Sequence, residues 1–426
     1  MAITCVSVEN FKPFRDRVNI PLKPITVFIG ANSAGKSSAI HALAALKQSA
    51  QRQLPGRALL LDGPDALVSL GRYVDAVHAH DYRKQIGLGI KFEANLQVYD
   101  FTSGGRVGRR VQTADLEYWW RFHGTLRTQR VLLASRSCVV LGHEFQVKRR
   151  PKTSEYIATL DQDSSELNVV QVQNLAVRVQ APLRSSTEEE FRRYAAWQML
   201  NAADEAMLRE LERIQYLGPF RYPPQRLYAY HGTSPGVGPD GRGAIPLLIS
   251  EITGHQRRPN LQYVQEWLQR LGLIHEMKVS RQGTSDYFRV EVKASDRSEV
   301  GTPADIGFGF SQVLPVLVQC AFAEEGGTYL FEQPEIHLHP TAQRRLGLFF
   351  ADALNRRRAT YVLETHSRYL IYGLQDAVRD RVLNGEDVIV YAVRSNNGIS
   401  ALRSYRIDEG GDLWDEWERG FVEPWE

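Results

Sequence analysis

The nine residues from Gly30 to Ser38 read GANSAGKSS, a glycine-rich turn that ends in a lysine and two serines. This spacing matches G-x-x-x-x-G-K-[ST], in which successive backbone N–H groups wrap the phosphates of a nucleotide at the start of a helix. Lys36 is expected to reach the β- and γ-phosphate oxygens, and Ser37 is expected to ligate Mg²⁺. We therefore predict a phosphate site that is built from Gly30, Asn32, Ser33, Ala34, Gly35, Lys36, Ser37 and Ser38.

A second group of polar residues lies nearly the whole chain later, in YLFEQPEIHLHP from Tyr329 to Pro340. The apolar run ends in Glu332, as in the acid-bearing strand of an ATPase, but the next position, which often carries a water-activating glutamate, holds Gln333. An amide cannot accept the proton of an attacking water as a carboxylate can, so the sequence predicts slow hydrolysis. Two origins stay open: Gln333 is native, or it is an engineered hydrolysis trap. In the native case Glu335 and His366 could position the water, as the glutamine of some GTPases does.

Short apolar runs are the elements that must position these residues. PITVFIG, from Pro24 to Gly30, has the pattern of a buried parallel strand that feeds the helical segment AGKSSAIHALAALKQ. The same strand pattern returns in TYLFE, ATYVLETH and DVIVYAV, which are separated by helical stretches. Because alternating strands and helices are typical of a parallel sheet, we predict an α/β fold with a mainly parallel core sheet.

The chain between the two groups of polar residues has a different character. From about Arg83 to Val179 apolar and polar residues alternate, which predicts an antiparallel β lobe. The following segment, from Ser186 to Ile214, has apolar residues at helical spacing and predicts one long amphipathic helix. No heptad pattern is sustained between Arg83 and Pro303, so we expect no long coiled coil. The predicted parts are a phosphate-loop half at 1–82, a β-rich lobe at 83–180, a helical and mixed insertion at 181–300 and an acidic-strand half at 301–426.

The order of the motifs resembles that of a known family. A Walker A loop is followed by a long insert, by GFGFSQVLP leading into a helix, by an acidic strand ending in PEIHLHP and by a strand ending in THS. This order resembles the ABC-type P-loop ATPase heads of the SMC, RecF and OLD proteins. It is most similar to the standalone "AAA family" ATPases, which include OLD-like proteins and the ATPase subunits of bacterial anti-phage systems such as PARIS and Septu. SVENFKPFRD, SLGRYVDAVHAHD, YLGPFRYPPQR and LWDEWERGFVE resemble their opening strand, the segment after the first helix, a linker and the tail.

The resemblance implies roles for individual residues. In ABC heads the signature segment, which here would be Gly309, Ser311 and Gln312, binds the γ-phosphate held by the opposite subunit, so ATP joins two heads. Glu332 takes the position of the acid that orients Mg²⁺, and His366 takes that of the switch histidine that senses the γ-phosphate. Without the resemblance, His366 could instead be a core histidine at a strand end.

Two departures from the family pattern concern hydrolysis rather than ATP binding. Gln333 replaces the usual glutamate, and no glutamine of a Q-loop stands between Ser69 and His80. In addition, His339 falls where a D-loop aspartate would be. A metal pair of His337 and His339 is not indicated, because no third ligand lies nearby in the sequence.

The charge of the chain leaves two interpretations open. The formal net charge of +3 is too small to demand a nucleic-acid partner. Basic residues nevertheless gather between Arg106 and Lys152, where they could hold a phosphate backbone or an acidic protein, or could form a solvated strand face. These residues are Arg106, Arg109, Arg110, Arg121, Arg127, Arg130, Arg136, Lys148, Arg149, Arg150 and Lys152, against Asp115, Glu117 and Glu144.

Composition also indicates the compartment. Cys5, Cys138 and Cys320 lie far apart without metal-ligand spacing, so neither a disulfide framework nor a zinc site is indicated. No apolar run is long enough to span a bilayer, and the N-terminus lacks the basic-then-apolar pattern of a secretion signal. We therefore expect a cytoplasmic protein that does not contact a membrane.

These observations lead to one hypothesis and two alternatives. The residues after His366 lack the acidic cluster of the TOPRIM nuclease that OLD proteins carry, so an effector would be a separate protein. We expect an ATPase that binds ATP and Mg²⁺, forms a homo-oligomer and controls a nuclease or toxin in phage defence, with DNA or a phage protein as trigger. The homo-oligomer would be a head-to-head dimer or a higher assembly. The alternatives are a RecF-like ATPase that binds DNA ends in repair, and a non-hydrolysing scaffold that ATP holds together.

Overall fold

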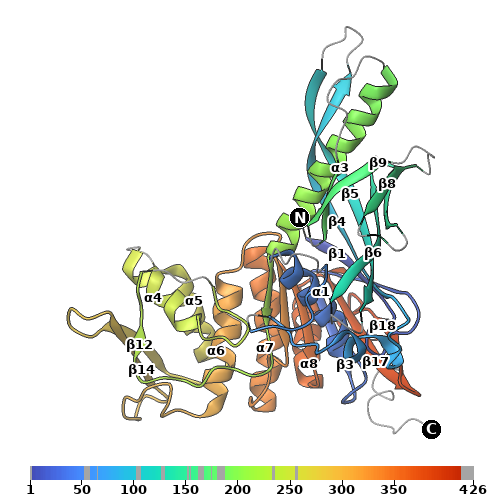
Figure 1. Cartoon of the computed structure of the whole chain (residues 1–426). Coiled ribbons are helices and arrows are strands. Elements are labelled where there is room, and N and C mark those ends of the chain that lie inside the picture. Colours follow the sequence, from blue (N-terminus) through green and yellow to red (C-terminus); the bar gives the residue numbers. More distant parts are fainter. Residues whose placement is uncertain are drawn as a thin grey trace. The chain divides into compact units, whose positions relative to one another are not determined.

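The computed structural model describes residues 2–51, 58–64, 66–101, 107–125, 130–150, 153, 155–161, 167–173, 175–179, 188–232, 236–254 and 258–413 (Figure 1). These residues form two compact units, each assembled from segments that lie far apart in the sequence. The first unit takes the described residues of Met1–Leu22, Ser33–Ile214 and Ser395–Ala401, and the second unit takes those of Lys23–Asn32, Gln215–Arg394 and Leu402–Glu426. The four-part division stays a prediction. The tail segment LWDEWERGFVE lies outside the described residues after Leu413.

A nine-stranded antiparallel sheet forms most of the first unit, in the order β10-β9-β8-β7-β6-β5-β4-β1-β2. The two longest strands pair from Ile86↔Phe122 to Phe101↔Val107. The antiparallel β lobe predicted from Arg83 to Val179 is confirmed, and two N-terminal strands extend its sheet. The strands are β1 (Ile3–Glu9), β2 (Val18–Pro21), β4 (Ile86–Phe101), β5 (Val107–Gly124), β6 (Val131–Val140), β7 (His143–Arg149), β8 (Tyr156–Leu160), β9 (Leu167–Gln173) and β10 (Ala176–Val179).

Two helices pack in the first unit, α1 (Lys36–Ala50) and α3 (Glu188–Glu212). α3 lies along β4 (Figure 1) and also contacts α1. A lysine of α1 is buried in this contact. The Lys47 ammonium donates hydrogen bonds to the backbone carbonyls of Glu212, at 3.2 Å, and of Ile214. Because these carbonyls stand at the end of α3, the bonds hold the helix that follows the phosphate loop against α3.

One basic residue of the region between Arg106 and Lys152 lies inside the first unit. Arg136 on β6 is 3% exposed, and its guanidinium donates to both carboxylate oxygens of Asp204 on α3. Asp204 also accepts a hydrogen bond from the Tyr118 hydroxyl and one from the Val177 backbone N–H, each at 3.0 Å. Arg136 therefore ties a strand to a helix in the core, and its inclusion in a surface charge cluster was wrong. Arg106, Arg127, Lys152 and the side chain of Arg109 lie outside the described residues.

The second unit is built around a six-stranded sheet in the order β11-β15-β16-β3-β17-β18. Four of its strands pair in parallel, and they are the apolar runs from which the parallel sheet was predicted. The prediction of an α/β fold with a mainly parallel core sheet is therefore confirmed. The parallel strands are β15 (Thr328–Glu332), β16 (Thr360–Thr365), β3 (Ile25–Gly30) and β17 (Val388–Asn396), and the outer strands are β11 (Ile214–Leu217) and β18 (Ile399–Tyr405).

Helices cover this sheet and share one apolar core with it. The rings of Phe331, Phe350 and Tyr361 meet in that core, with centroids 5.6 to 6.4 Å apart. The helices of the second unit are α4 (Ala244–Gly254), α5 (Pro259–Arg270), α6 (Phe308–Ala321), α7 (Pro340–Arg357) and α8 (Arg368–Arg379). A small sheet contains β12 (Tyr228–Ala229), β13 (Glu276–Arg281) and β14 (Tyr287–Lys293). Short helices are α2 (Tyr73–Ala76) in the first unit and single 3-10 turns at His78–His80 and Gly385–Asp387.

The expected absence of a long coiled coil holds for the described part of the chain. Its longest helix is α3, with 25 residues, and α3 packs mainly along β4, with a smaller contact to α1. Among the described helices, none combines the length and the apolar character that a bilayer crossing needs. Cys5, Cys138 and Cys320 are buried free thiols.

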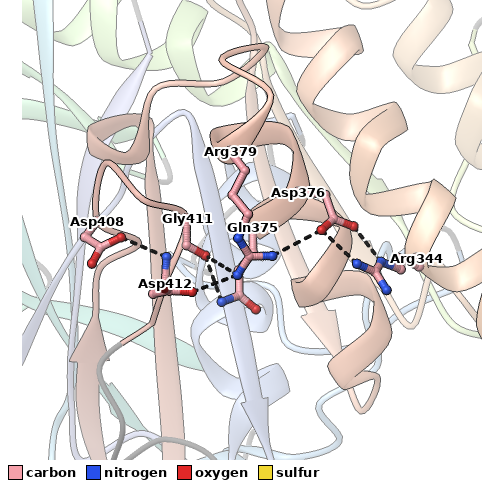
Figure 2. A network of polar contacts seen from close by, with 7 residues as sticks. All are labelled: Arg344, Gln375, Asp376, Arg379, Asp408, Gly411 and Asp412. Carbon is pink, nitrogen blue, oxygen red and sulfur yellow. Dashed lines mark hydrogen bonds and ion pairs between the residues drawn. The ribbon is translucent and has the colours of Figure 1, made fainter.

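A polar network holds α8 against its neighbours (Figure 2). Arg344 of α7 donates to the two carboxylate oxygens of Asp376 on α8, at 2.5 and 2.8 Å. Arg379 donates to the same carboxylate at 3.2 Å and to that of Asp412 at 2.8 Å. Exposed ion pairs each contribute only about 0.2–1 kcal/mol, but several that share one carboxylate restrict the direction of the helix. This helix begins two residues after His366.

Candidate functional site

The carboxyl edge of the parallel sheet in the second unit collects the predicted polar residues. In the strand register, Glu332 lies beside Glu364, and Glu364 lies beside Phe28, two residues before Gly30. The start of the phosphate loop, the acidic strand end and the strand end before His366 therefore share one edge. Ligands of open α/β sheets bind outside this edge.

Two glycines bound the phosphate loop. At Gly30, with φ 156°, a side-chain Cβ would lie 2.3 Å from the backbone carbonyl oxygen of Val393. At Gly35, with φ 98°, it would lie 2.5 Å from Pro13 Cγ and 2.5 Å from Ser400 Oγ. Because no side chain tolerates such approaches, both positions need glycine, the first in the second unit and the second in the first unit.

The loop enters α1 at Lys36, as the pattern predicts. The Ser400 hydroxyl donates to the Ala34 carbonyl, which holds the end of the loop, and the Ser38 N–H donates to the Gly35 carbonyl at 3.1 Å. The backbone N–H groups of this first turn are the donors that a phosphate would use. Asn32 and Ser33 are exposed, Gly30, Gly35 and Ser37 are half-buried, and Ala34, Lys36 and Ser38 are buried.

Glu332 ends β15 as a buried carboxylate that the protein holds in place. The Tyr216 hydroxyl donates to Glu332 Oε1 at 2.7 Å, and Arg221 Nη2 donates to the Glu332 backbone carbonyl at 3.2 Å. Burial and the neighbouring Glu332 charge both raise the pKa of the Tyr216 hydroxyl, so this hydroxyl remains a hydrogen-bond donor at neutral pH. The predicted Mg²⁺ acid therefore has a fixed orientation.

Gln333 follows directly and has a left-handed backbone conformation, with φ 46°. Its N–H donates to the Glu364 carbonyl at 2.8 Å, so the ladder between β15 and β16 continues one residue beyond the strand. A residue before proline is disfavoured in the right-handed helical region, and Pro334 comes next. The half-buried Gln333 thus sits in a turn whose backbone is held by the neighbouring strand.

Glu335 is 5% exposed and binds the end of β16. Its Oε1 accepts a hydrogen bond from the Thr365 hydroxyl at 2.6 Å and one from the His366 N–H at 3.0 Å. Burial raises the pKa of Glu335, and these bonds oppose the shift because they favour the ionised form. Glu335 therefore positions the backbone at His366, a role that its place in the sequence did not indicate.

His366 itself is exposed, so the alternative of a core histidine is wrong. The next residue, Ser367, caps α8: its hydroxyl accepts from the Leu370 N–H at 3.2 Å and donates to the Gln343 amide oxygen at 2.6 Å. The described backbone thus holds His366 between a strand end and a helix cap, with its side chain at the surface.

The signature-like residues Gly309, Ser311 and Gln312 occupy the first turn of α6. Ser311 is 7% exposed, and its hydroxyl donates to the Phe308 carbonyl at 2.9 Å. A Cβ at Gly309 would lie 3.1 Å from the His337 carbonyl oxygen, so this turn packs closely on the segment after β15. The predicted serine therefore faces its own helix, and Phe308, 72% exposed, is the large side chain that this turn presents to solvent.

Sequence reasoning missed two residues of this edge, Tyr216 and Arg221. Both belong to YLGPFRYPPQR, which had been interpreted as a linker. The sequence contained a signal for them, because Tyr216 and Arg221 lie in a segment that resembles one of the family. His339, which was expected at the D-loop position, caps α7 by accepting a hydrogen bond from the Thr341 N–H at 3.3 Å.

Comparisons with known proteins agree with the phosphate loop. Residues 1–187 match the family described as "AAA ATPase domain", and residues 274–371 match the family described as "AAA domain, putative AbiEii toxin, Type IV TA system". These matches support an ATP-binding ATPase. None of the curated proteins that were compared with this chain matches it.

Three solved structures are similar to this chain. They are an SMC head bound to the C-winged helix domain of ScpA (12% identity, TM-score 0.47, 96% of this chain and 99% of that chain), the SMC head domain from Thermotoga maritima (10%, 0.40, 95% and 98%) and an Smc head domain with an extended coiled coil, bound to the C-terminal domain of ScpA and derived from Pyrococcus furiosus (11%, 0.41, 95% and 96%). These TM-scores are too low to carry an argument, so the fold rests on the strands and helices described above.

The two residues that are predicted to hold Mg²⁺ carry oxygen donors. Ser37 in the first unit has a hydroxyl and Glu332 in the second unit has a carboxylate, and Mg²⁺ binds oxygen ligands of this kind. Within the described ranges, no group of three or more His, Cys, Asp or Glu side chains could hold a metal.

Proposed function

We propose that the chain is a slow ABC-type ATPase whose ATP-bound form assembles from two or more copies. The observation that supports this most is the carboxyl edge of the parallel sheet. There the start of the phosphate loop, the strand end before His366 and Glu332 stand on the three adjacent strands β3, β16 and β15.

In this proposal the first turn of α1 binds the phosphates of ATP. Lys36 offsets the charge of the β- and γ-phosphate oxygens, and Ser37 and Glu332 hold Mg²⁺, which neutralises developing charge on the phosphates when it is bound. The hydrogen bond from Tyr216 keeps the Glu332 carboxylate in one orientation. ATP and Mg²⁺ are thus the expected cofactors.

Slow turnover follows from the residue after the Mg²⁺ acid. The amide of Gln333 can orient a water but cannot accept its proton. Glu335 acts through His366, because its carboxylate already binds Thr365 and the His366 backbone. ATP would therefore be held longer than it is hydrolysed, and the ATP-bound assembly would be the resting state.

The assembly and its purpose rest on the family resemblance. The first turn of α6, with Gly309, Ser311 and Gln312, would meet the γ-phosphate held by a second copy. In that resemblance lies the case for control of a separate effector, a nuclease or a toxin, in anti-phage defence. We place this function in the cytoplasm, with DNA or a phage protein as trigger.

Two variants test the binding and the assembly separately. Lys36→Ala should abolish tight ATP binding in calorimetry, because it removes a charge-assisted contact with the phosphates. The exposed lysine Lys278 on β13 provides the control, and Lys278→Ala should bind ATP normally. Ser311→Arg should bind ATP but should not assemble on adding ATP, as measured by native mass spectrometry. Retained micromolar affinity in Lys36→Ala would contradict the phosphate loop, and normal assembly of Ser311→Arg would contradict the signature segment.

Turnover tests the role of Gln333. Gln333→Glu restores a proton acceptor and should raise steady-state hydrolysis by about 10²–10⁴-fold. Fast turnover by the chain as written would contradict the slow-clamp proposal. No turnover in either form would favour the non-hydrolysing scaffold instead.

A RecF-like DNA-binding function would depend on the basic region. Lys148 is exposed there, whereas Arg150 lies 3.7 Å from Glu155 and Arg121 lies 3.3 Å from Glu9, which reduces the net charge available. Duplex binding that weakens with salt and is lost when Lys148, Arg149 and Arg150 are reversed to Glu would favour this alternative.

A further inference from the structure

The segment from Tyr216 to Arg226 brings a buried arginine to the carboxyl edge of the parallel sheet. Arg221 is 9% exposed, although arginine is rarely buried unless it is paired. Its Nη2 donates to the Glu332 backbone carbonyl at 3.2 Å, at the last residue of β15. The guanidinium therefore lies at the strand end that carries the predicted Mg²⁺ acid.

Most donors of this guanidinium are unused within the described chain. Arg221 Nε and Nη1 are buried and have no hydrogen-bond partner among the described residues. Each buried donor that lacks a partner destabilises the fold, and a buried cation does so more strongly. A ligand whose oxygens accept hydrogen bonds from Arg221 Nε and Nη1 would offset this cost.

The charge of Arg221 persists in this environment. An arginine guanidinium remains protonated in proteins, so the buried Arg221 carries a positive charge at neutral pH. Its planar fork of N–H groups matches the oxygens of a phosphate better than an ammonium would. The expected ligand is therefore a phosphate group at the edge where the phosphate loop begins.

We propose that Arg221 binds the terminal phosphate of ATP at the carboxyl edge of the parallel sheet in the second unit. This inference rests on the proposed ATPase function and adds a residue to it. The γ-phosphate is absent from ADP, so Arg221 would distinguish the two nucleotides. It would also stabilise the negative charge that develops on the phosphate during hydrolysis, where Gln333 supplies no proton acceptor.

The affinities for ATP and ADP provide the test. Arg221→Gln should weaken ATP binding by about 10–100-fold, as expected for the loss of a charged hydrogen bond, and should change ADP binding by less than about threefold. Arg226→Gln is the matched control, because Arg226 lies in the same segment but is exposed and pairs with Asp305 at 2.7 and 3.0 Å. It should leave both affinities unchanged.

Several outcomes would overturn the inference. Equal losses for ATP and ADP, or no loss for either, would show that Arg221 does not contact the γ-phosphate. If Arg221→Gln does not fold, Arg221→Lys keeps the charge without the fork and should lower the ATP-to-ADP preference in part, and an unchanged preference would refute the assignment. Any rise in melting temperature on adding inorganic phosphate should be the same in the wild-type chain and in Arg221→Gln. Stabilisation by phosphate that is lost in Arg221→Gln, with an unchanged nucleotide preference, would assign the site to a free anion.

The inference and the proposed function fail in different ways. Lys36-dependent ATP binding by the wild-type chain, with an unchanged preference in Arg221→Gln, would overturn only the role of Arg221. Absence of Lys36-dependent ATP binding in the wild-type chain would overturn the proposed function and the role of Arg221 with it.

Discussion

Replacement of Asp204 by alanine should strongly destabilise the first unit. Asp204 is 4% exposed and accepts hydrogen bonds from Arg136, from the Tyr118 hydroxyl and from the Val177 N–H. Burial alone would lower the pKa of Arg136, but the Asp204 charge raises it above its ordinary value. The variant would therefore leave a charged guanidinium in the core without its carboxylate.

The expected loss can be worked from these contacts. Removing one partner of a buried ion pair costs about 3–5 kcal/mol, and a buried donor left without an acceptor costs about 1–3 kcal/mol. Because Tyr118 and Val177 can relax, we expect a total loss of about 4–6 kcal/mol in the free energy of unfolding. At about 2–4 °C per kcal/mol for a domain of this size, the melting temperature of the first unit should fall by roughly 10–20 °C.

Hydrogen exchange of the β5 and β6 amides in urea would measure this loss without mixing the two units. Glu205→Ala is the control: Glu205 is the next residue on α3, is exposed and lies 3.7 Å from Arg209, so its loss should cost less than about 0.5 kcal/mol. The double variant Arg136→Met with Asp204→Leu should recover much of the loss, since apolar side chains can replace a buried ion pair. A loss below about 1 kcal/mol for Asp204→Ala would refute the reasoning.

Three further predictions concern the site and its support. Glu335→Ala should lower turnover by about 10–100-fold at unchanged ATP affinity, because the His366 backbone loses its hydrogen bond to the carboxylate. The amide oxygen in Glu335→Gln can still accept both bonds, so equal turnover of the two variants would contradict this. Burial lowers the pKa of Lys47 from 10.5 to about 8, so between these values the unfolded chain binds more protons and stability should rise with pH by about 1–3 kcal/mol. Lys47→Met should lack that rise in urea unfolding at pH 7.5 and 10, and an identical pH dependence would exclude Lys47 as its source. Gly35→Ala should weaken ATP binding at least about tenfold in calorimetry, because φ 98° and the surrounding atoms leave no room for a Cβ, and unchanged affinity would show that the loop can adapt.

The local patterns in the sequence were sufficient to predict the main strands and the antiparallel lobe. Runs such as PITVFIG and TYLFE became the buried parallel strands β3 and β15, and the alternating residues after Arg83 became the antiparallel lobe. The phosphate loop was also readable, since the conformations of Gly30 and Gly35 require glycine at set positions next to a strand and a helix. Such features depend on neighbours within a few residues, so the sequence specifies them directly.

Contacts between distant segments were decided only by the tertiary structure. Arg136 had the sequence context of a surface charge, yet it pairs with Asp204, and Arg221 stood in an apparent linker, yet it meets Glu332. The sequence placed Glu335 near the chemistry but could not show that its carboxylate binds the end of β16.

The physical reason is the same in each case. The sequence around a charged residue does not show whether its side chain will be buried or paired, because desolvation and pairing depend on which segments the fold brings together. Backbone conformation and apolar periodicity are properties of short stretches, so the strands, helices and phosphate loop follow from the sequence by itself. The partners of Arg136, Arg221 and Glu335 lie dozens of residues or more away along the chain. Local spacing predicts none of these partners, and only tertiary packing determines them.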